Sequence, residues 1–333
     1  MTAPVRWGVA GTGWMAATFV DDFAHVPDAE LVAVGSRTLD RAQAFAADRG
    51  GVGMTYADVV AADLDVLYVA TPHPQHRDLA LAAIANGTPV LVEKSLTATL
   101  DGAREVVAAA REAGVFCMEA MWTRLQPAVL AARELVAAGE IGEVTSVHAD
   151  FGAHRAYDPA HRLFAPELGG GVVLDLGVYC ISIAQHFLGT PSGVTATGSL
   201  FPNGTDASAS LLLTYDDGRG ATLTASLQAA TGRRATLVGT RGSIEIGPEF
   251  YRPTQLVVRR GDDPEEVLDL PAVGIDYSHE VVHVNECLAQ GLTESPVVPL
   301  NDTLVVQWVM QEALDQLGIT AVEGVVDLSR PRG

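Results

Sequence analysis

Lys94 is the only lysine in this chain of 333 residues, in which 21 side chains are lysine or arginine. A guanidinium stays protonated at any accessible pH, whereas an ammonium is a compact donor whose ionisation responds to burial. The residue directly follows the apolar run 90–92, which predicts a buried parallel strand. Because ligands bind at the carboxyl ends of strands in open α/β sheets, we interpret Lys94 as a functional group. The alternative is one surface lysine left by chance.

A second pair of candidates, Asp175 and Tyr179, lies in a predicted helix that runs to about Leu188. A spacing of four places the two side chains on one helix face, about one turn apart. A carboxylate and a phenol are poor core residues, and the preceding glycines at 169–171 allow a close approach of the backbone. The pattern indicates a functional face; the alternative is a helix whose polar face meets solvent.

The N-terminal segment predicts the scaffold that positions Lys94. Residues 11–16 read G-x-G-x-x-A directly after an apolar strand at 5–10, a pattern that lets a pyrophosphate lie on the N-terminus of the next helix. The alternative is a glycine-rich turn without a ligand. Strands are then predicted at 30–35, 65–70 and 89–92, and helices at 39–49, 75–86 and 100–113. Alternation at this pace predicts an α/β fold, a doubly wound parallel sheet of the Rossmann type.

The end of the second predicted strand indicates the cofactor. An acid there would bind a ribose 2′-hydroxyl, whereas this chain has Ser36 and Arg37, with Arg41 one turn further on. We therefore predict NADP over NAD. The alternative is an arginine that stacks on adenine, which would tolerate both cofactors.

Two histidine motifs raise the question of a metal. The loop at 70–76 follows a predicted strand; we expect Thr71 and Pro72 to pack on the cofactor and His76 to fix the loop, although His73 and His76 are conceivable ligands. Residues 279–283 match H-E-x-x-H, a zinc pattern when it lies on a helix. No third ligand stands at a recognised spacing, so we predict no metal.

The character of the chain changes near Trp122. From residue 143 the sequence alternates with period two, notably in 194–201, 208–215, 221–228 and 233–239, which indicates an antiparallel sheet with one buried face. We predict a dinucleotide-binding domain at 1–122. The remainder, 123–333, is predicted to be an α+β domain for substrate binding and oligomerisation.

The overall composition and charge indicate which classes of binding partner and which cellular location to expect. A net charge of -20 argues against nucleic acid and anionic membrane surfaces. The three cysteines are odd in number and far apart, which suits a reducing cytoplasm without disulfides. The N-terminus has no apolar leader, and we find no run of about 18 apolar residues, so a cytoplasmic location is expected. An open sheet with helices on one side favours a homodimer.

Several motifs together resemble the glucose-fructose oxidoreductase / inositol dehydrogenase (Gfo/Idh/MocA) family, and most of all its dimeric dihydrodiol dehydrogenase branch. They are the N-terminal fingerprint, A-T-P-H-P-Q-H at 70–76, V-E-K at 92–94, M-E-A-M-W-T-R at 118–124, G-G-G-V-V-L-D-L-G-V-Y at 169–179 and the pattern from 277 to 296. The resemblance implies a second domain with an open, mainly antiparallel sheet. It also implies oxidation of a secondary alcohol on a sugar, polyol or cyclic diol, or the reverse reaction.

The resemblance further implies which residues act. Lys94 and Tyr179 are expected at the reacting carbon with Asp175 in support; we predict Tyr179 as acid/base and Lys94 as its electrostatic partner, although Lys94 itself could shuttle the proton. The cofactor is expected to contact Gly11, Gly13, Trp14, Met15, Ser36, Arg37, Arg41, Thr71, Pro72, His73, His76, Glu93, Lys94, Trp122 and Arg124.

Two positions depart from the family pattern. Ser95 replaces a proline that is usually cis, and because a cis bond before another residue costs about 2.5–4 kcal/mol, we expect the loop after Lys94 to follow a different path. Tyr179 replaces a histidine of many relatives, which disfavours inositol-type substrates. Two other functions stay open: an NADP(H) sensor without turnover, which would not need all three catalytic candidates, and a zinc hydrolase based on 279–283.

Overall fold

A computed structural model describes residues 3–329, which form two compact units. The first unit contains the chain up to Ala120, Val273–Leu300 and the segment from Val322 onward; the second contains Met121–Ala272 and Asn301–Ala321. The first boundary lies near the expected one at 122, but the sequence assigned all of 123–333 to the second domain. Residues 273–300 return to the first unit because the buried Asp22 carboxylate accepts hydrogen bonds from the backbone N–H groups of Ile275, Tyr277 and Ser278.

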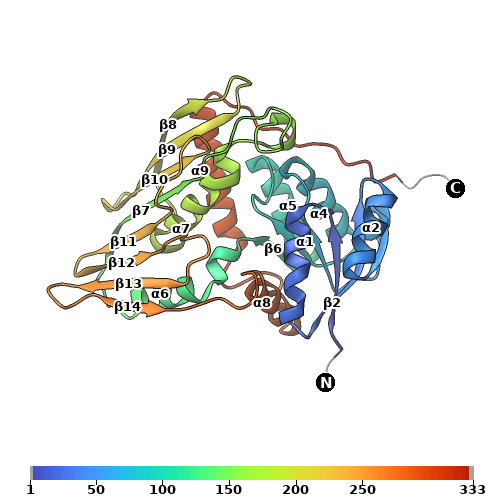
Figure 1. Cartoon of the computed structure of the whole chain (residues 1–333), viewed down its shortest axis with the longest axis horizontal. Helices are drawn as coiled ribbons and strands as arrows, with labels where there is room; N and C mark the ends of the chain where they lie inside the picture. Colours follow the sequence, from blue (N-terminus) through green and yellow to red (C-terminus); the bar gives the residue numbers. More distant parts are fainter. Residues whose placement is uncertain (1–2, 330–333) are drawn as a thin grey trace. The chain divides into compact units, whose positions relative to one another are not determined.

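The first unit holds a parallel sheet of six strands in the order β3-β2-β1-β4-β5-β6. The strands are β1 (Val5–Ala10), β2 (Ala29–Ser36), β3 (Val52–Thr55), β4 (Val66–Val69), β5 (Val90–Glu93) and β6 (Cys117–Ala120). Its longer helices are α1 (Trp14–Asp21), α2 (Leu39–Arg49), α4 (His76–Ala85), α5 (Leu100–Ala113) and α8 (Ser278–Ala289) (Figure 1). The predicted doubly wound sheet is confirmed.

Burial explains why the central strands form. All residues of β4, β5 and β6 are buried, as expected of parallel strands covered on both faces. Beside them, the ring of Phe19 on α1 stacks on Tyr68 of β4 with centroids 3.9 Å apart. Two short elements, β3 and α3 (Tyr56–Val59), were not predicted, because each has only four residues, too few to show a period.

The second unit holds a sheet of eight strands in the order β14-β13-β12-β11-β7-β10-β9-β8. The strands are β7 (Val144–Gly152), β8 (Gly193–Leu200), β9 (Asp206–Thr214), β10 (Gly220–Ser226), β11 (Ala235–Gly239), β12 (Gly242–Ile246), β13 (Gln255–Arg260) and β14 (Glu266–Asp269). The mainly antiparallel sheet is confirmed with one correction: β7 and β10 pair in parallel. A parallel pair needs a long connection, which α7, β8 and β9 provide here.

Three helices complete the second unit: α6 (Pro127–Ala137), α7 (Val178–Leu188) and most of α9 (Leu300–Gln316). α7 packs on β7 and β10, and its side chains are almost all buried (Figure 1). The helical stretch Pro166–Leu188 is long and apolar enough to cross a membrane, with a mean hydropathy of 1.5, but 89% of it is buried inside the protein. A core helix of a globular protein has the same properties.

Candidate active site

Lys94 directly follows β5 and is half-buried at the carboxyl end of the parallel sheet, where the sequence placed it. The Lys94–Ser95 peptide bond is cis, so the expected different path of this loop is not observed. Ser95 is completely buried, and its carbonyl oxygen lies 3.0 Å from Nδ1 of His76. Tertiary contacts therefore hold serine in this place.

Two side chains tie the loop after Lys94 to its surroundings. His76 reaches Ser95 O with Nδ1 and Thr71 O with Nε2, at 3.0 and 2.7 Å, so one ring connects the loops that follow β4 and β5. Burial lowers the pKa of His76, and its carbonyl partners act in the opposite direction. On the other side, the backbone N–H of Leu96 donates to Glu119 Oε1 at 3.0 Å. The predicted role of His76 in fixing the loop agrees with this geometry.

Three carboxylates near the end of β5 are buried: Glu93, Glu119 and Glu280 are at most 6% exposed, and the charges of Glu93 and Glu119 act on Glu280. The hydroxyl of Tyr68 donates to Glu93. Burial and then the charges of Glu93 and Glu119 raise the pKa of Glu280 well above its usual range. The sequence did not single out Glu119, which binds the loop after Lys94 through the Leu96 N–H, or Glu280. The available signal was an acid at the end of the apolar run 115–118.

The dinucleotide turn has the expected shape. Gly11 has φ +126°, and a Cβ there would lie 2.4 Å from Ala70 O, so only glycine fits. Around Gly13, which precedes α1, a Cβ would meet nothing within 4 Å. Trp14 opens the helix and is 75% exposed, and Met15 Sδ accepts from the hydroxyl of Tyr277 at 3.7 Å. The open backbone at the start of α1 can receive a phosphate group.

The polar groups at the end of β2 are placed as predicted. Ser36 is buried with its Oγ 3.4 Å from that of Thr12, and the Arg37 and Arg41 side chains are exposed. Both guanidinium groups lie close enough to Tyr56 to act on the pKa of its hydroxyl, although burial outweighs them and raises that pKa. Two cations thus converge at this corner.

The loop after β4 also fits a nucleotide. Thr71 Oγ1 is buried and has no hydrogen-bond partner among the described residues. Pro72 is the cap residue directly before the short helix η2 (His73–Gln75), and His73 is 5% exposed with its ring 5.7 Å from that of His76. An orphaned hydroxyl next to the glycine turn is the kind of group that a bound cofactor satisfies. The residues present therefore fit a dinucleotide.

In the second unit, Tyr179 is the second residue of α7, and its ring lies within an aromatic cluster. The indole N–H of Trp122 donates to its hydroxyl oxygen at 2.9 Å. The rings of Phe151 and Tyr251 lie 5.6 and 5.9 Å from that of Tyr179. A donor aimed at the phenol oxygen stabilises its ionised form. The sequence placed Trp122 against the cofactor and missed this contact.

Asp175 lies one turn before Tyr179, but in the π-helical turn η5 (Val173–Gly177) and not in regular α-helix. Its Oδ1 is 3.4 Å from Nη1 of the half-exposed Arg162. The turn begins where Asp206 Oδ2 accepts from the Val173 N–H at 2.6 Å. At Gly171, with φ +123°, a Cβ would lie 1.9 Å from Asp206 Oδ1, which confirms the predicted close approach at the triple glycine.

Arg124 has a different role from the expected cofactor contact. Its guanidinium donates to Ser182 Oγ and Ser182 O, to Gln185 Oε1 and to Asp302 Oδ2 at 2.6–3.0 Å. These bonds use four of its five N–H groups. The buried side chain thus ties the short helix η3 (Trp122–Leu125) to α7 and α9.

The H-E-x-x-H motif forms the start of α8, and its two histidines have separate partners. His279 Nε2 accepts from the Val273 N–H at 3.1 Å, whereas His283 Nε2 lies 2.7 Å from Ser295 Oγ. Within residues 3–329, no group of three or more His, Cys, Asp or Glu side chains is placed to hold a metal ion. The glutamate between them, Glu280, instead joins the buried carboxylates.

Comparison with known proteins extends this picture. Residues 5–121 match the oxidoreductase family with an NAD-binding Rossmann fold, and residues 129–245 match the GFO/IDH/MocA C-terminal domain. Trans-1,2-dihydrobenzene-1,2-diol dehydrogenase from Xenopus tropicalis is 36% identical over 330 residues, covering 95% of this chain and 98% of that protein. The protein of the same name from Mus musculus is 36% identical over 332 residues, with the same coverage of 95% and 98%.

Solved structures agree. A 3-ketoreductase from Actinomadura kijaniata in complex with NADP and TDP-benzene has a TM-score of 0.82 at 26% identity, covering 96% of this chain and 99% of that one. For an aldose-aldose oxidoreductase from Caulobacter crescentus the TM-score is 0.84 at 23% identity, with coverage of 95% and 98%, which shows the shared fold. These matches confirm the predicted resemblance, and the chain belongs to the GFO/IDH/MocA family of NAD(P)-binding oxidoreductases.

Proposed function

We propose that this enzyme uses NADP to transfer a hydride between the nicotinamide and the CH–OH carbon of a small sugar, polyol or cyclic diol. The observation that carries the proposal is the Tyr179 hydroxyl, which accepts a hydrogen bond from Trp122 inside an aromatic cluster. A phenol held in this way is suited to take up and return a proton. The names of the dihydrodiol dehydrogenase relatives and of the 3-ketoreductase support the substrate class.

The cofactor is assigned to the carboxyl end of the parallel sheet. The turn at Gly11 and the start of α1 would receive the pyrophosphate, and Thr71 would supply a hydroxyl. Arg37 and Arg41 would hold the 2′-phosphate, which is the basis for NADP; the structural relative in complex with NADP supports this choice. When bound, the nicotinamide accepts or gives the hydride.

The protein's own part is proton transfer. As a secondary alcohol loses hydride, its C–O bond becomes a carbonyl and the hydroxyl proton must leave to a base. We assign that base to the Tyr179 phenolate, which the Trp122 N–H stabilises. In the reductive direction the Tyr179 hydroxyl returns the proton to the forming alkoxide.

Lys94 and Asp175 are assigned supporting roles. We assign to the Lys94 ammonium a hydrogen bond to the substrate oxygen. Asp175, one turn before Tyr179, is assigned to bind a second substrate hydroxyl. The aromatic rings of Phe151, Tyr251 and Trp122 around Tyr179 suit a substrate with an apolar face, such as a cyclic diol.

A substrate panel tests the proposal. Purified protein is incubated with NADP+ or NAD+ and with aldoses, cyclitols, acyclic polyols and aromatic dihydrodiols, and reduced nicotinamide is followed by absorbance. We expect reduction of NADP+ with at least one sugar or cyclic diol. Turnover of none of these classes, in either direction and with either cofactor, would refute the proposal.

A further inference from the structure

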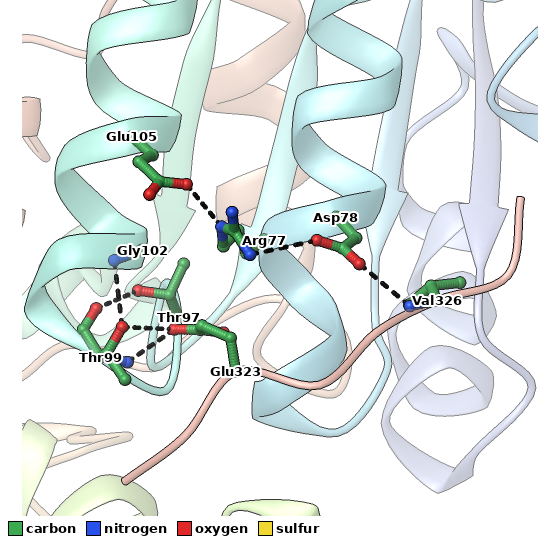
Figure 2. Close-up of polar contacts among 8 residues, drawn as sticks. All are labelled: Arg77, Asp78, Thr97, Thr99, Gly102, Glu105, Glu323 and Val326. Atoms are coloured by element: carbon green, nitrogen blue, oxygen red, sulfur yellow. Dashed lines mark hydrogen bonds and ion pairs between the residues drawn. The ribbon is translucent and has the colours of Figure 1, made fainter.

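The segment 322–326 crosses the N-terminal ends of α4 and α5 within the first unit (Figure 2). It has no regular secondary structure, and its contacts come from one side chain, Glu323, and from two backbone N–H groups. Both helices begin at loops that follow the catalytic edge of the sheet: 71–76 leads into α4, and 94–99 leads from Lys94 into α5. The segment therefore contacts the outer ends of both loops.

Glu323 completes the N-terminal cap of α5. Its Oε1 accepts from both the backbone N–H and the hydroxyl of Thr99, each at 2.8 Å, and Thr99 Oγ1 in turn accepts from the Gly102 N–H at 3.0 Å. In a capping box, a glutamate three residues after the cap makes the contact to the cap N–H. Here a glutamate 224 residues away in sequence makes that contact.

Gly102 makes room for this carboxylate. It stands at the third position of α5, where a capping box carries its glutamate, and a Cβ there would lie 2.4 Å from Glu323 Oε1. Gly102 does not have a positive φ, so its conformation does not require glycine, and glycine weakens a helix relative to alanine. Glycine at this position leaves room for the Glu323 carboxylate where the structure places it.

The same segment also contacts the entry to α4. The Gly324 N–H donates to Pro74 O at 2.7 Å, and the Val326 N–H donates to Asp78 Oδ2 at 3.0 Å. Nearby, Arg77 joins the two helices through Glu105 at 2.6 Å (Figure 2). The loop after β4 and the loop after β5 are thus tied twice, near the sheet by His76 and at their outer ends by 322–326.

We propose that the segment 322–326 is a clasp that holds the loop after Lys94 in its working position, with Glu323 as the positioning residue. Lys94 stands five residues before Thr99, and the intervening residues are buried. A displacement at Thr99 is therefore transmitted to Lys94, because close-packed segments move together. This inference rests on the proposed function, in which Lys94 acts at the substrate oxygen.

The primary test compares Glu323→Ala with Glu323→Gln. Glutamine keeps an oxygen that can accept from Thr99, whereas alanine removes it. We expect Glu323→Ala to lower kcat about tenfold, within the loss that a slightly misplaced catalytic group causes, and Glu323→Gln to stay within about twofold of wild type. Asp327→Ala is the matched control, since this exposed carboxylate, directly after the segment, contacts only Ser329 among the described residues.

The readouts separate positioning from mere stabilisation. We measure kcat and KM well below the melting temperature, the dissociation constant of NADPH by fluorescence, and amide hydrogen exchange over 95–102. The clasp predicts a lower kcat with faster exchange at 95–102. An unchanged kcat together with a lower melting temperature would show a structural role only and overturn the proposal.

A second pair of variants guards against a folding defect in Glu323→Ala. Gly102→Ala alone pushes a Cβ against the carboxylate and should lower kcat. In the Glu323→Ala background the same change meets no carboxylate and should raise the melting temperature without a further fall in kcat. Equal effects of Gly102→Ala in both backgrounds would contradict the clasp.

Lys94→Ala distinguishes failure of the clasp from failure of the proposed function. If Lys94→Ala abolishes turnover while Glu323→Ala leaves kcat unchanged, the clasp alone is wrong. If Lys94→Ala retains turnover, the role of Lys94 is wrong, and the clasp, which acts through it, is overturned as well.

Discussion

The acid strength of the Tyr179 phenol can be tested through Trp122, because the indole N–H donates to the phenol oxygen at 2.9 Å. Trp122→Phe removes the donor and keeps an aromatic ring. Because a hydrogen bond to the charged form is worth about 1.5–3 kcal/mol, we expect the pH at which alcohol oxidation becomes half-maximal to rise by about one to two pH units. The measurement is kcat/KM against pH; Trp308→Phe on α9 is the control. An unshifted profile would show that Tyr179 is not the titrating base.

Arg37 determines the cofactor in this account. Arg37→Ala should weaken NADP binding by about tenfold to a hundredfold, since each charge-assisted hydrogen bond contributes about 1.5–3 kcal/mol. NAD binding should hardly change. Titration of both cofactors by fluorescence measures the effect, with the exposed Arg104→Ala as control. Equal losses for NADP and NAD would mean that the side chain stacks on adenine.

At the scale of single residues, the sequence indicates candidate side chains but not the contacts that they make. Lys94 and Tyr179 were identified because their types and places in predicted elements are unusual. The partners were not: Trp122 donates to Tyr179, and Arg124 is bound to Ser182 and other groups near α7. Such pairs join residues 57 and 58 positions apart, and no periodicity marks them.

The turn that carries Asp175 depends on one buried acid from β9. Burial raises the pKa of Asp206 to about 6, although the hydrogen bond from the Val173 N–H acts to lower that pKa. The folded chain therefore binds this proton more tightly than the unfolded chain. The contribution of Asp206 to the free energy of unfolding is fully present below a pH of about 4 and is lost as the pH rises through about 6.

Asp206→Asn removes this titration and keeps an oxygen for Val173. We expect the unfolding free energy of the variant, relative to wild type, to rise between about pH 4 and pH 7 by an amount on the order of 3 kcal/mol. Urea unfolding at several pH values measures it. A difference that does not change with pH would contradict the assignment.

At the scale of elements, prediction succeeded where an apolar periodicity extends over several turns and is bounded by residues that end a helix. The helices Leu39–Arg49 and Leu100–Ala113 begin and end where the sequence placed them, because apolar periodicity is bounded by turn residues and, at Gly114, by a left-handed cap. The parallel pairing of β7 with β10 was not predictable from alternation, since period two is common to both kinds of pairing.

For the whole molecule, the division into two units was predictable at Ala120 but not beyond. The later crossings are marked by long-range contacts, such as Asp22 with Tyr277 and Glu323 with Thr99, that connect residues 255 and 224 positions apart. Gly102 is the one local trace of the second contact in the sequence.

The exposed face of the second sheet is the surface to consider for association between two copies of the chain. Five cross-strand neighbours on β11, β7, β10, β9 and β8 are exposed or half-buried in the chain and carry no charge of aspartate, glutamate, lysine or arginine: Thr236, His148, Thr222, Leu212 and Thr195. This uncharged run ends at β12, where Glu245 pairs with Thr236. In a protein of charge -20, such charge depletion is typical of an interface core.

We therefore propose a homodimer through this face. Light scattering after size exclusion should give twice the chain mass at micromolar concentration, and Leu212→Glu should give monomers by burying a charge. Val325→Glu, at a site that is 93% exposed outside the sheet, is the control. A monomeric wild-type protein across micromolar concentrations would contradict the proposal.

The central claim is that proton transfer to and from the substrate oxygen needs a compact ammonium at Lys94. The most direct test is kcat of Lys94→Arg with NADP+ and the best substrate of the panel. Arginine keeps the positive charge, but its larger planar group cannot replace a compact ammonium. We predict a loss of about 10²-fold or more with cofactor binding retained, as expected when a positioned group of the proton-transfer step is removed. Near-normal turnover of Lys94→Arg would contradict the account.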